Sequence, residues 1–427
     1  MLNHKAIKDL RGKHLGPSLS LSYDKPLHIV RGEGQYLYDA DGNQYLDCIN
    51  NIQHVGHCHP KVVSAAQKQY TQLNTNTRYL DETIVKYAKN LTDTLPTGLE
   101  VCFFTNSGSE ANDLALRIAR QYTGSKETIV LDGAYHGNLS SLIEISPYKY
   151  NGPGGNGAPD FVYMLSMPDS FRGRYRGEDC GEQYAQEVQK VISEIQNKGN
   201  KVSTFIAEAL MGCGGQLVLP TDFIKKTFDL VRAAGGVCII DEVQIGFGRI
   251  GSHFWGFQTH DVTPDIVTMG KSMGNGHPLS AVVTTKEIAD AFNNGMEYFN
   301  SFGGNPVSCA VGQAVLNVIR DEGLQAHAEH VGNYLLQKLQ SLQNNHEIIG
   351  DVRGRGLCIG IELVRDYELT PAANEAHTIV NSMQEKGVLL STDGPDHNVI
   401  KIKPPMIFSK DNAHELVSKI DETIAEL

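Results

Sequence analysis

The sequence has no long apolar run and no excess of basic residues. No stretch approaches the roughly 20 apolar residues that a membrane-spanning helix needs, and the first residues lack the apolar core of a signal peptide. Lys and Arg number 37 against 49 Asp and Glu, whereas nucleic-acid phosphates require a basic face. We therefore expect neither a membrane nor a nucleic acid as a partner.

Cysteine pairs and nucleotide-binding glycine motifs are also missing. The eight cysteines are scattered singly, without a CxxC pair, which predicts reduced thiols and a cytoplasmic protein. His54, His57 and His59 surround Cys58, but no second cysteine lies at zinc-motif spacing, so we expect no metal site. GxxxxGK(S/T) is absent, which argues against a P-loop enzyme. The spacing GxGxxG occurs at residues 152–157 and 246–251, but neither copy joins an expected strand directly to an expected helix, which argues against a NAD-dependent enzyme.

Apolar runs alternate with helical patterns through the middle of the chain. Strands that alternate with helices predict an α/β fold, with a mostly parallel sheet flanked by helices. Ligands bind such sheets at the carboxyl ends of the strands. We expect strands within residues 101–104, 128–131, 204–207, 237–240, 266–267 and 281–283, and helices within residues 109–121, 183–198, 223–234 and 306–320.

The two ends of the chain have a different pattern. Residues 36–39 and 44–47 flank an Asp-Gly turn, which is a hairpin signal, and helices mix with short strands after about residue 325. We expect a large domain at residues 61–322. Residues 1–60 and 323–427 are expected to form one smaller, discontinuous α+β domain.

Two charged residues lie at the ends of expected buried strands. Asp241 ends one apolar run, and Lys271 follows another within a glycine-rich segment. Pyridoxal phosphate (PLP) requires both groups, because an amine forms a Schiff base with its aldehyde and a carboxylate pairs with its ring nitrogen. The alternatives are that Lys271 is a solvated surface lysine and that Asp241 pairs with a local arginine.

Two further turns also follow expected strands. Ser107, Gly108 and Ser109 precede a helix, where backbone N–H groups and hydroxyls can hold a phosphate. The alternative is an ordinary helix cap made by Ser109. Tyr135 and His136 follow the next strand, where an aromatic ring can stack on a flat heterocycle or can be buried in a turn.

Together these segments resemble the class III (omega-type) aminotransferases, which are fold-type I PLP enzymes. The matching segments are SGSEAN at 107–112, YHG at 135–137, IIDEVQIGFGR at 239–249, TMGKSMGNG at 268–276, FGGNP at 302–306, GHCHP at 56–60 and GRGLCIGIEL at 354–363. The resemblance extends over nearly the whole chain. It implies the fold-type I architecture, with a large domain and a smaller α+β domain, and PLP as the cofactor.

The resemblance also implies roles for individual residues. Lys271 would form the Schiff base and later move protons, and Asp241 would keep the ring nitrogen protonated. The remaining expected contacts are Ser107, Gly108 and Ser109 at the phosphate, Tyr135 with His136 at the ring, Gln244 near the 3-hydroxyl, Glu208 facing the substrate entrance, and Ser301 reaching the phosphate from the neighbouring subunit. We therefore expect a homodimer or a tetramer with its active site at the subunit interface.

One position departs from the family's pattern. Many class III aminotransferases carry an arginine shortly before a Pro-Pro pair, and this arginine grips the substrate α-carboxylate through two parallel bonds. Here the segment reads NVIKIKPP at 398–405, and the position is Lys401. A lysine cannot make that planar match, so binding of an α-carboxylate is not expected. The alternative is a strand-surface lysine without a ligand.

Other segments are similar to the ethanolamine-phosphate and phosphohydroxylysine phospho-lyases. These segments are TNTRYL at 75–80, LIEISPYK at 142–149, HFW at 253–255, MEYFN at 296–300 and KIKPPM at 401–406. They imply elimination of phosphate from a small phosphorylated amine such as phosphoethanolamine, giving acetaldehyde, ammonia and phosphate. Arg78, Lys401 and Lys403 are the candidates for binding the substrate phosphate.

Two alternatives to a phospho-lyase stay open. One is an omega-aminotransferase that passes an amino group from a terminal-amine donor to pyruvate or a related keto acid. The other is a non-catalytic protein of the same fold, against which the presence of both Lys271 and Asp241 argues.

Overall fold

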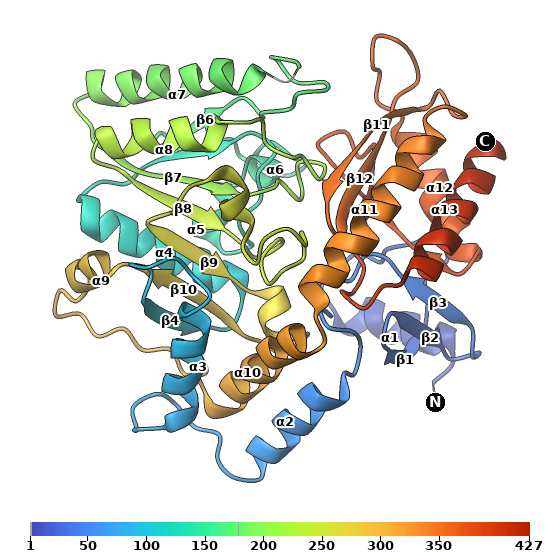
Figure 1. Cartoon of the computed structure of the whole chain (residues 1–427), viewed down its shortest axis with the longest axis horizontal. Helices are drawn as coiled ribbons and strands as arrows, with labels where there is room; N and C mark the ends of the chain where they lie inside the picture. The colour runs from blue at the N-terminus through green and yellow to red at the C-terminus, as the bar shows by residue number, and fades with distance from the viewer. Residues whose placement is uncertain (1, 178) are drawn as a thin grey trace.

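The computed structural model describes residues 2–177 and 179–427. The chain folds into two parts that lie side by side (Figure 1). The larger part contains a twisted sheet with helices on both faces, and the smaller part contains both chain ends, so the first and last segments of the sequence meet there.

A seven-stranded sheet forms the centre of the larger part. Strand β10 runs antiparallel to its two neighbours, and the other strand pairs are parallel. This confirms the predicted mostly parallel α/β sheet. In spatial order the strands are β4 (Val101–Thr105), β10 (Ser280–Thr284), β9 (Ile266–Met269), β8 (Val237–Asp241), β7 (Val202–Glu208), β5 (Glu127–Leu131) and β6 (Val162–Leu165).

Helices cover both faces of this sheet. Ile206 and Ile239 pack in one core with α4 (Gly108–Thr123). Their neighbours Phe205 and Ile240 pack on the opposite face in a core that includes α7 (Cys180–Asn197) and α8 (Phe223–Ala233). Burial on both faces explains why the strands are continuous apolar runs. The other elements of this part are α2 (Pro60–Tyr70), α3 (Glu82–Thr92), α5 (Ser140–Ile143), α6 (Pro147–Tyr150), α9 (Lys286–Phe292), α10 (Pro306–Asp321) and the 3-10 turns η1 (Gly256–His260) and η2 (Lys271–Gly274).

Two four-stranded sheets form the smaller part. The first contains β1 (Ile29–Glu33), β2 (Tyr36–Asp39), β3 (Gln44–Asp47) and β13 (Val388–Leu389); the second contains β11 (Ile349–Arg355), β12 (Cys358–Leu363), β15 (Val399–Ile402) and β14 (Ser391–Asp393). The helices here are α1 (His4–His14), α11 (Leu324–Leu342), α12 (Ala373–Glu385) and α13 (Lys410–Ala425). Because β3 pairs with β13, the two chain ends share a sheet. The domain bounds, residues 61–322 against residues 1–60 with 323–427, stay a prediction.

Two partly buried arginines connect the two parts. Arg172, in the loop after β6, donates from Nε to Glu362 Oε1 (2.6 Å) and from Nη2 to Asp396 Oδ2 (2.7 Å). Arg353 Nη1 lies 2.6 Å from Glu362 Oε2, and its Nη2 donates to the carbonyl of Gly215 at 2.7 Å. These bonds hold the sheet of β11, β12, β15 and β14 against the loop that follows β7.

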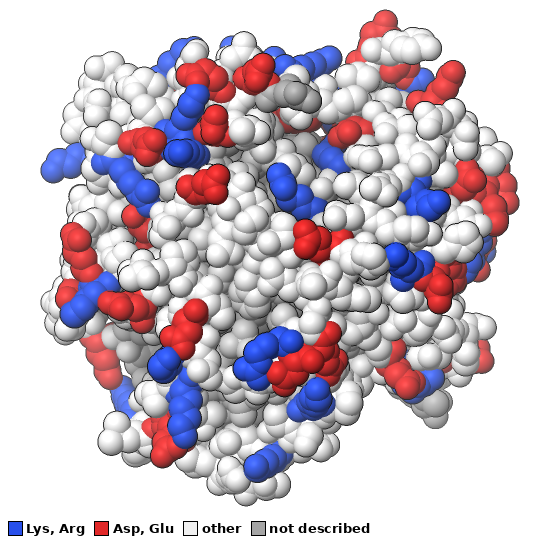
Figure 2. All heavy atoms as spheres, in the orientation of Figure 1, with Lys and Arg blue, Asp and Glu red and all other residues white. Residues whose placement is uncertain are grey.

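Charges on the surface are mixed rather than segregated. Figure 2 shows Lys and Arg side chains among Asp and Glu, without a large area of one sign on this face. Some pair along helices, such as Lys286 with Asp290. Within the described residues, no helix combines the length and the apolar character needed to cross a membrane.

Candidate active site

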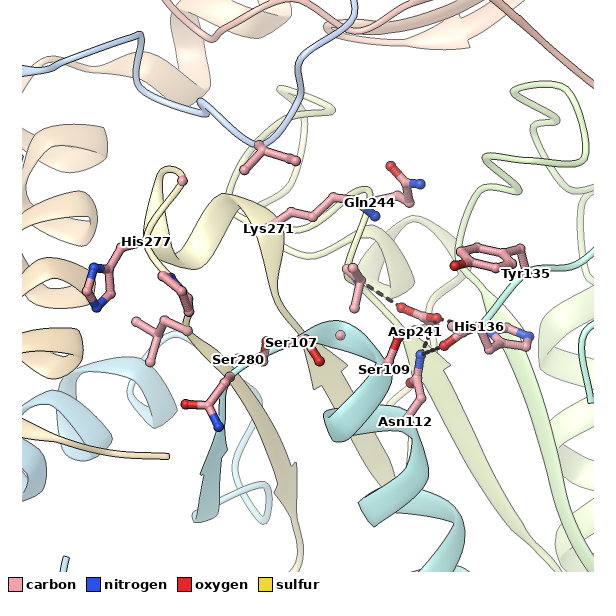
Figure 3. Close-up of a pocket in the computed structure, with 18 residues that line it drawn as sticks. Ser107, Ser109, Asn112, Tyr135, His136, Asp241, Gln244, Lys271, His277 and Ser280 are labelled. Atoms are coloured by element: carbon pink, nitrogen blue, oxygen red, sulfur yellow. Dashed lines mark hydrogen bonds and ion pairs between the residues drawn. The ribbon is translucent and has the colours of Figure 1, made fainter. Parts of the chain in front are cut away.

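A cavity of about 340 Å³ lies where the expected strand ends meet. Its walls come from the turn before α4, the loop after β5, the ends of β8 and β9, and the segment before β10 (Figure 3). The fold therefore collects short segments that lie far apart in the sequence. The predicted residues that line this cavity are Ser107, Gly108, Ser109, Tyr135, His136, Asp241, Gln244 and Lys271.

Asp241 is buried at the end of β8 and has a fixed orientation. Its Oδ2 accepts hydrogen bonds from Asn112 Nδ2 (2.7 Å) and His136 Nδ1 (3.0 Å), and its Oδ1 accepts one from the backbone N–H of Val243 (3.0 Å). Asn112 is itself held by Thr268 Oγ1, which donates to Asn112 Oδ1 at 2.6 Å. These polar partners replace the local arginine that was the alternative expectation, and Figure 3 shows the cluster beside the cavity.

Lys271 begins η2 with a backbone φ of +32°. A side chain rarely adopts this left-handed region, and such strain is concentrated at functional sites. The side chain extends toward the segment that carries Gln244 (Figure 3). Burial lowers the pKa of the Lys271 amine, the Asp241 carboxylate opposes this effect, and the Lys403 ammonium reinforces it. A lowered pKa raises the fraction of neutral amine, which is the form that acts as a nucleophile or a base.

The first turn of α4 faces the cavity. Ser107 caps the helix by accepting a hydrogen bond from the backbone N–H of Glu110 at 3.2 Å. Ser109, the residue expected as the cap, instead accepts one from the backbone N–H of Asn138 at 3.0 Å. The N–H groups of a first helical turn have no partner within the helix. Ser107 can therefore cap α4 while other N–H groups of the same turn bind a phosphate, as predicted.

Two glycines let the backbone approach closely at this turn. A Cβ atom on Gly108 would lie 2.9 Å from the side chain of Val243, and one on Gly270 would lie 3.1 Å from Ser280 Oγ and 3.3 Å from the backbone N of Gly108. Larger residues would push the α4 turn away from the strand ends. The glycines therefore keep the cavity narrow at the end where an anion would bind.

Some buried polar atoms at the cavity have no partner in the protein. His136 Nε2 and Ser280 Oγ are both buried without a hydrogen bond. An unpaired buried polar atom costs about 1–3 kcal/mol, so a polar ligand would stabilise this arrangement. Tyr135 lies beside His136 (Figure 3), where its ring packs edge-on against Tyr148 with centroids 6.2 Å apart. Burial raises the pKa of the Tyr135 hydroxyl.

Glu208, Lys401 and Lys403 do not line the cavity but form a neighbouring group of charges. Glu208 and Lys403 are each 1 % exposed. Lys401 is half-buried, and its Nζ lies 3.5 Å from Asp393 Oδ2. Lys403 is thus not a surface lysine, whereas the alternative of a strand-surface lysine stays open for Lys401.

Arg78 and Ser301 lie outside the cavity of their own chain. Ser301 is exposed. Arg78 bonds through Nη2 to Glu297 Oε1 (2.9 Å) and stacks over the ring of Phe299. The role of each residue stays a prediction.

The three histidines near Cys58 have structural partners. His57 Nε2 bonds to Asp47 Oδ2 at 2.6 Å, and His54 Nε2 bonds to the carbonyl of Phe247 at 2.7 Å. His59 Nε2 lies 3.4 Å from a Glu322 carboxylate oxygen. No group of three or more potential metal-binding side chains occurs among residues 2–177 and 179–427.

Four residues in or near the site were not predicted from the sequence: Asn112, Ser280, Cys213 and Asp393. Asn112 was inside a matched motif, and its position one turn into a helix that starts at the cavity could have identified it. Ser280, Cys213 and Asp393 carried no signal, because their places depend on how distant strands and loops pack together.

Comparisons with known proteins agree with this geometry. A family model described as aminotransferase class-III matches residues 20–424. An alanine–glyoxylate aminotransferase 2-like protein of Drosophila melanogaster is 52% identical over 96% of this chain and 84% of its own length. Ethanolamine-phosphate phospho-lyase homolog 1 of Caenorhabditis elegans is 44% identical, with 98% and 95% covered. A solved phospholyase from Arthrobacter in complex with phosphoethanolamine has a TM-score of 0.94 and 42% identity, covering 99% of this chain and 100% of its own.

Proposed function

Because the chain belongs to the class III aminotransferase family, whose members depend on PLP, we propose that it is a PLP-dependent phospho-lyase. Its substrate would be a small amine such as phosphoethanolamine, and its products acetaldehyde, ammonia and phosphate. The observation that carries the proposal is Lys401 at the position where the family's pattern leads one to expect an arginine, with the buried Lys403 two residues further on.

The residues of the cavity fit PLP. The N-terminal turn of α4 with Gly108 suits the phosphate, and the fixed carboxylate of Asp241 suits the ring nitrogen. The unpaired Ser280 Oγ and His136 Nε2 can bond to polar atoms of a ligand. When bound, PLP supplies an electron sink that stabilises negative charge on the carbon next to the amine nitrogen.

The protein's own groups then handle the protons. We infer that the Lys271 amine would hold the cofactor and would also accept the proton that leaves the amine-bearing carbon of the substrate. Burial favours the neutral amine that this step needs. Asp241, oriented by Asn112 and His136, retains the proton at the ring nitrogen.

The substrate phosphate would lie against the two lysines. A phosphate carries close to two negative charges near neutral pH, and a lysine ammonium binds it as a point charge without the planar geometry that a carboxylate fork demands. Lys403 Nζ is buried and has no hydrogen-bond partner in the protein, so an anion that reached it would supply one. Phosphate is a good leaving group on the adjacent carbon, which favours elimination over amino transfer.

The named relatives support this proposal and also a second candidate. One relative is named as a phospho-lyase homologue, and one solved phospholyase was crystallised with phosphoethanolamine. The Drosophila relative, however, carries an aminotransferase name. The second candidate is therefore an omega-aminotransferase that passes an amino group to pyruvate or a related keto acid.

We further propose that two copies of the chain assemble to complete the site. Tyr79, Leu80 and Phe302 are strongly exposed apolar side chains close in sequence to Arg78 and Ser301. Burying such side chains against a second copy would be favourable, and Ser301 of one copy would reach the cofactor phosphate of the other. The cytoplasmic location and the number of subunits stay predictions.

A panel of amines tests the function. Phosphoethanolamine, phosphohydroxylysine and unphosphorylated ethanolamine are incubated with the PLP-loaded enzyme, with and without pyruvate, and both released phosphate and formed alanine are measured. We expect phosphate release without pyruvate, and its loss in Lys403→Met. Pyruvate-dependent formation of alanine without phosphate release would instead favour the aminotransferase.

A further inference from the structure

Glu208 is a buried acid to which the proposed reaction gives no task. It ends β7, directly opposite Asp241 of β8 in the parallel register. Its Oε2 accepts a hydrogen bond from the backbone N–H of Gly212 at 3.0 Å, whereas its Oε1 has no partner. A carboxylic acid in such a place costs free energy unless charge or chemistry compensates for its burial.

Glu208 and Lys403 converge on one point beside the loop after β7. A Cβ atom on Gly212 would lie 3.0 Å from Glu208 Oε2, 3.1 Å from Lys403 Nζ and 3.4 Å from Gln244 Cγ. Because residue 212 is a glycine, the Glu208 carboxylate and the Lys403 ammonium can both approach this point without forming a direct ion pair. Gln244 lines the cofactor cavity. Glu208 and Lys403 therefore lie next to the wall of that cavity.

Several ionisable groups surround Glu208. Burial raises its pKa to about 7, the Asp241 carboxylate adds to this effect, and His136, the Gly212 N–H and Lys403 oppose it. Glu208 thus changes charge near neutral pH. The groups that face it are Asp241 from β8, His136 from the loop after β5, Lys403 after β15, Cys213 from its own loop, Lys271 from η2 and Cys358 from β12.

We propose that Glu208 couples binding of the substrate phosphate at Lys403 to the uptake of one proton. In the free enzyme, the Glu208 carboxylate is a nearby counter-charge of Lys403. A phosphate dianion at Lys403 brings like charge close to that buried carboxylate, which is unfavourable. Glu208 removes the repulsion by taking a proton from the solvent onto a carboxylate oxygen, and no other bond changes. This inference rests on the proposed function, which places the substrate phosphate beside Lys403.

The sign of the pH dependence follows from the charge of each form. Below pH 7, Glu208 is protonated and neutral, so Lys403 attracts an anion most strongly. As the pH rises through about 7, the carboxylate forms and competes with the anion for Lys403. Affinity for a dianion should then fall, by at most about tenfold per pH unit, which is the slope for one linked proton.

Sulfate is a suitable probe because it stays a dianion at the pH values used. Binding of sulfate to the PLP-loaded enzyme is measured by titration calorimetry at several pH values, in pairs of buffers with different ionisation heats. We expect proton uptake that approaches one per sulfate above pH 7 and falls toward zero at lower pH. In Glu208→Gln, which keeps the shape but cannot titrate, uptake should vanish and the affinity should become independent of pH.

Two variants at neighbouring positions distinguish the contribution of Glu208 to the proton uptake from that of the other ionisable groups around it. Cys213→Ser should retain the proton uptake, because the thiol is not the linked group, and Lys403→Met should lose sulfate binding. The proposal is overturned if the wild-type enzyme binds sulfate without proton uptake, if it binds no sulfate at Lys403, or if Glu208→Gln keeps the uptake. None of these results depends on turnover, so the proposed lyase activity stands or fails separately.

Discussion

At the scale of single residues, Asp241 depends on its neighbours for its orientation. Asn112 and His136 each donate to the same carboxylate oxygen, and the backbone of Val243 donates to the other. A carboxylate held this way keeps one geometry when a ring nitrogen approaches it. This arrangement prepares the site before the cofactor binds, since no side chain has to reorient.

Replacing Asp241 by Asn should inactivate the enzyme without unfolding it. The amide has nearly the same shape but no negative charge, so the ring nitrogen would lose its proton and the electron sink would weaken. We expect kcat to fall on the order of a hundredfold or more, with an unchanged circular dichroism spectrum. Asp290→Asn, at an exposed carboxylate paired with Lys286, serves as the control and should keep full activity.

Gly108→Ala should weaken cofactor binding. The added Cβ would lie 2.9 Å from the side chain of Val243, which forces the start of α4 away from the strand ends. We expect the dissociation constant for PLP, measured by equilibrium dialysis, to rise about tenfold or more, the equivalent of roughly 1–3 kcal/mol of overpacking. Gly12→Ala, where a Cβ would meet no atom within 4 Å, should leave it unchanged, and equal affinity in both variants would contradict the role of Gly108.

The sequence predicted residues of the site to different degrees. Lys271 and Asp241 were predictable because a strand end is a local feature, visible as an apolar run followed by a polar residue. The burial of Lys403 was not, because it depends on the sheet of the smaller part packing against the loop after β7. For the same reason, the sequence did not predict that Glu208 is buried beside Asp241; its place at the substrate entrance stays a prediction.

At the scale of elements, the order of the strands decides which residues meet. The pairing of β7 with β8 places Glu208 next to Asp241, and the pairing of β8 with β9 brings Lys271 near both. The sequence predicted six of the seven strands but not this order, since apolar runs contain no information on which strand lies beside which. Strand β6 was not predicted, because four residues at a sheet edge give too short a pattern.

The loop after β6 should contribute to stability through Arg172. Arg172→Met removes bonds to Glu362 and Asp396 and leaves the buried Glu362 carboxylate with fewer donors. We expect a loss of about 1–3 kcal/mol in the free energy of unfolding, measured by urea denaturation. Arg174→Met, at a more exposed pair with Glu187, should change it by less than about 0.5 kcal/mol; equal losses would contradict a bridging role for Arg172.

At the scale of the whole molecule, the exposed apolar residues near Arg78 and Ser301 predict assembly. A charge placed there should oppose it, so Phe302→Asp should shift the protein toward a monomer in analytical ultracentrifugation. Activity per chain should fall in parallel, because Ser301 could no longer reach a second copy. Tyr367→Asp, at another strongly exposed aromatic residue in the smaller part, should leave the sedimentation unchanged. A Phe302→Asp protein that stays fully assembled would contradict the proposed interface.

The central claim is that Lys271, Asp241 and the two lysines carry out elimination rather than amino transfer. The most direct test counts the phosphate released per active site from phosphoethanolamine, with no keto acid present. A phospho-lyase regenerates its cofactor in every cycle, so the account predicts many phosphates per site together with equal amounts of acetaldehyde and ammonia. Release that stops at or below one equivalent per site, and continues only when pyruvate is added, would contradict it.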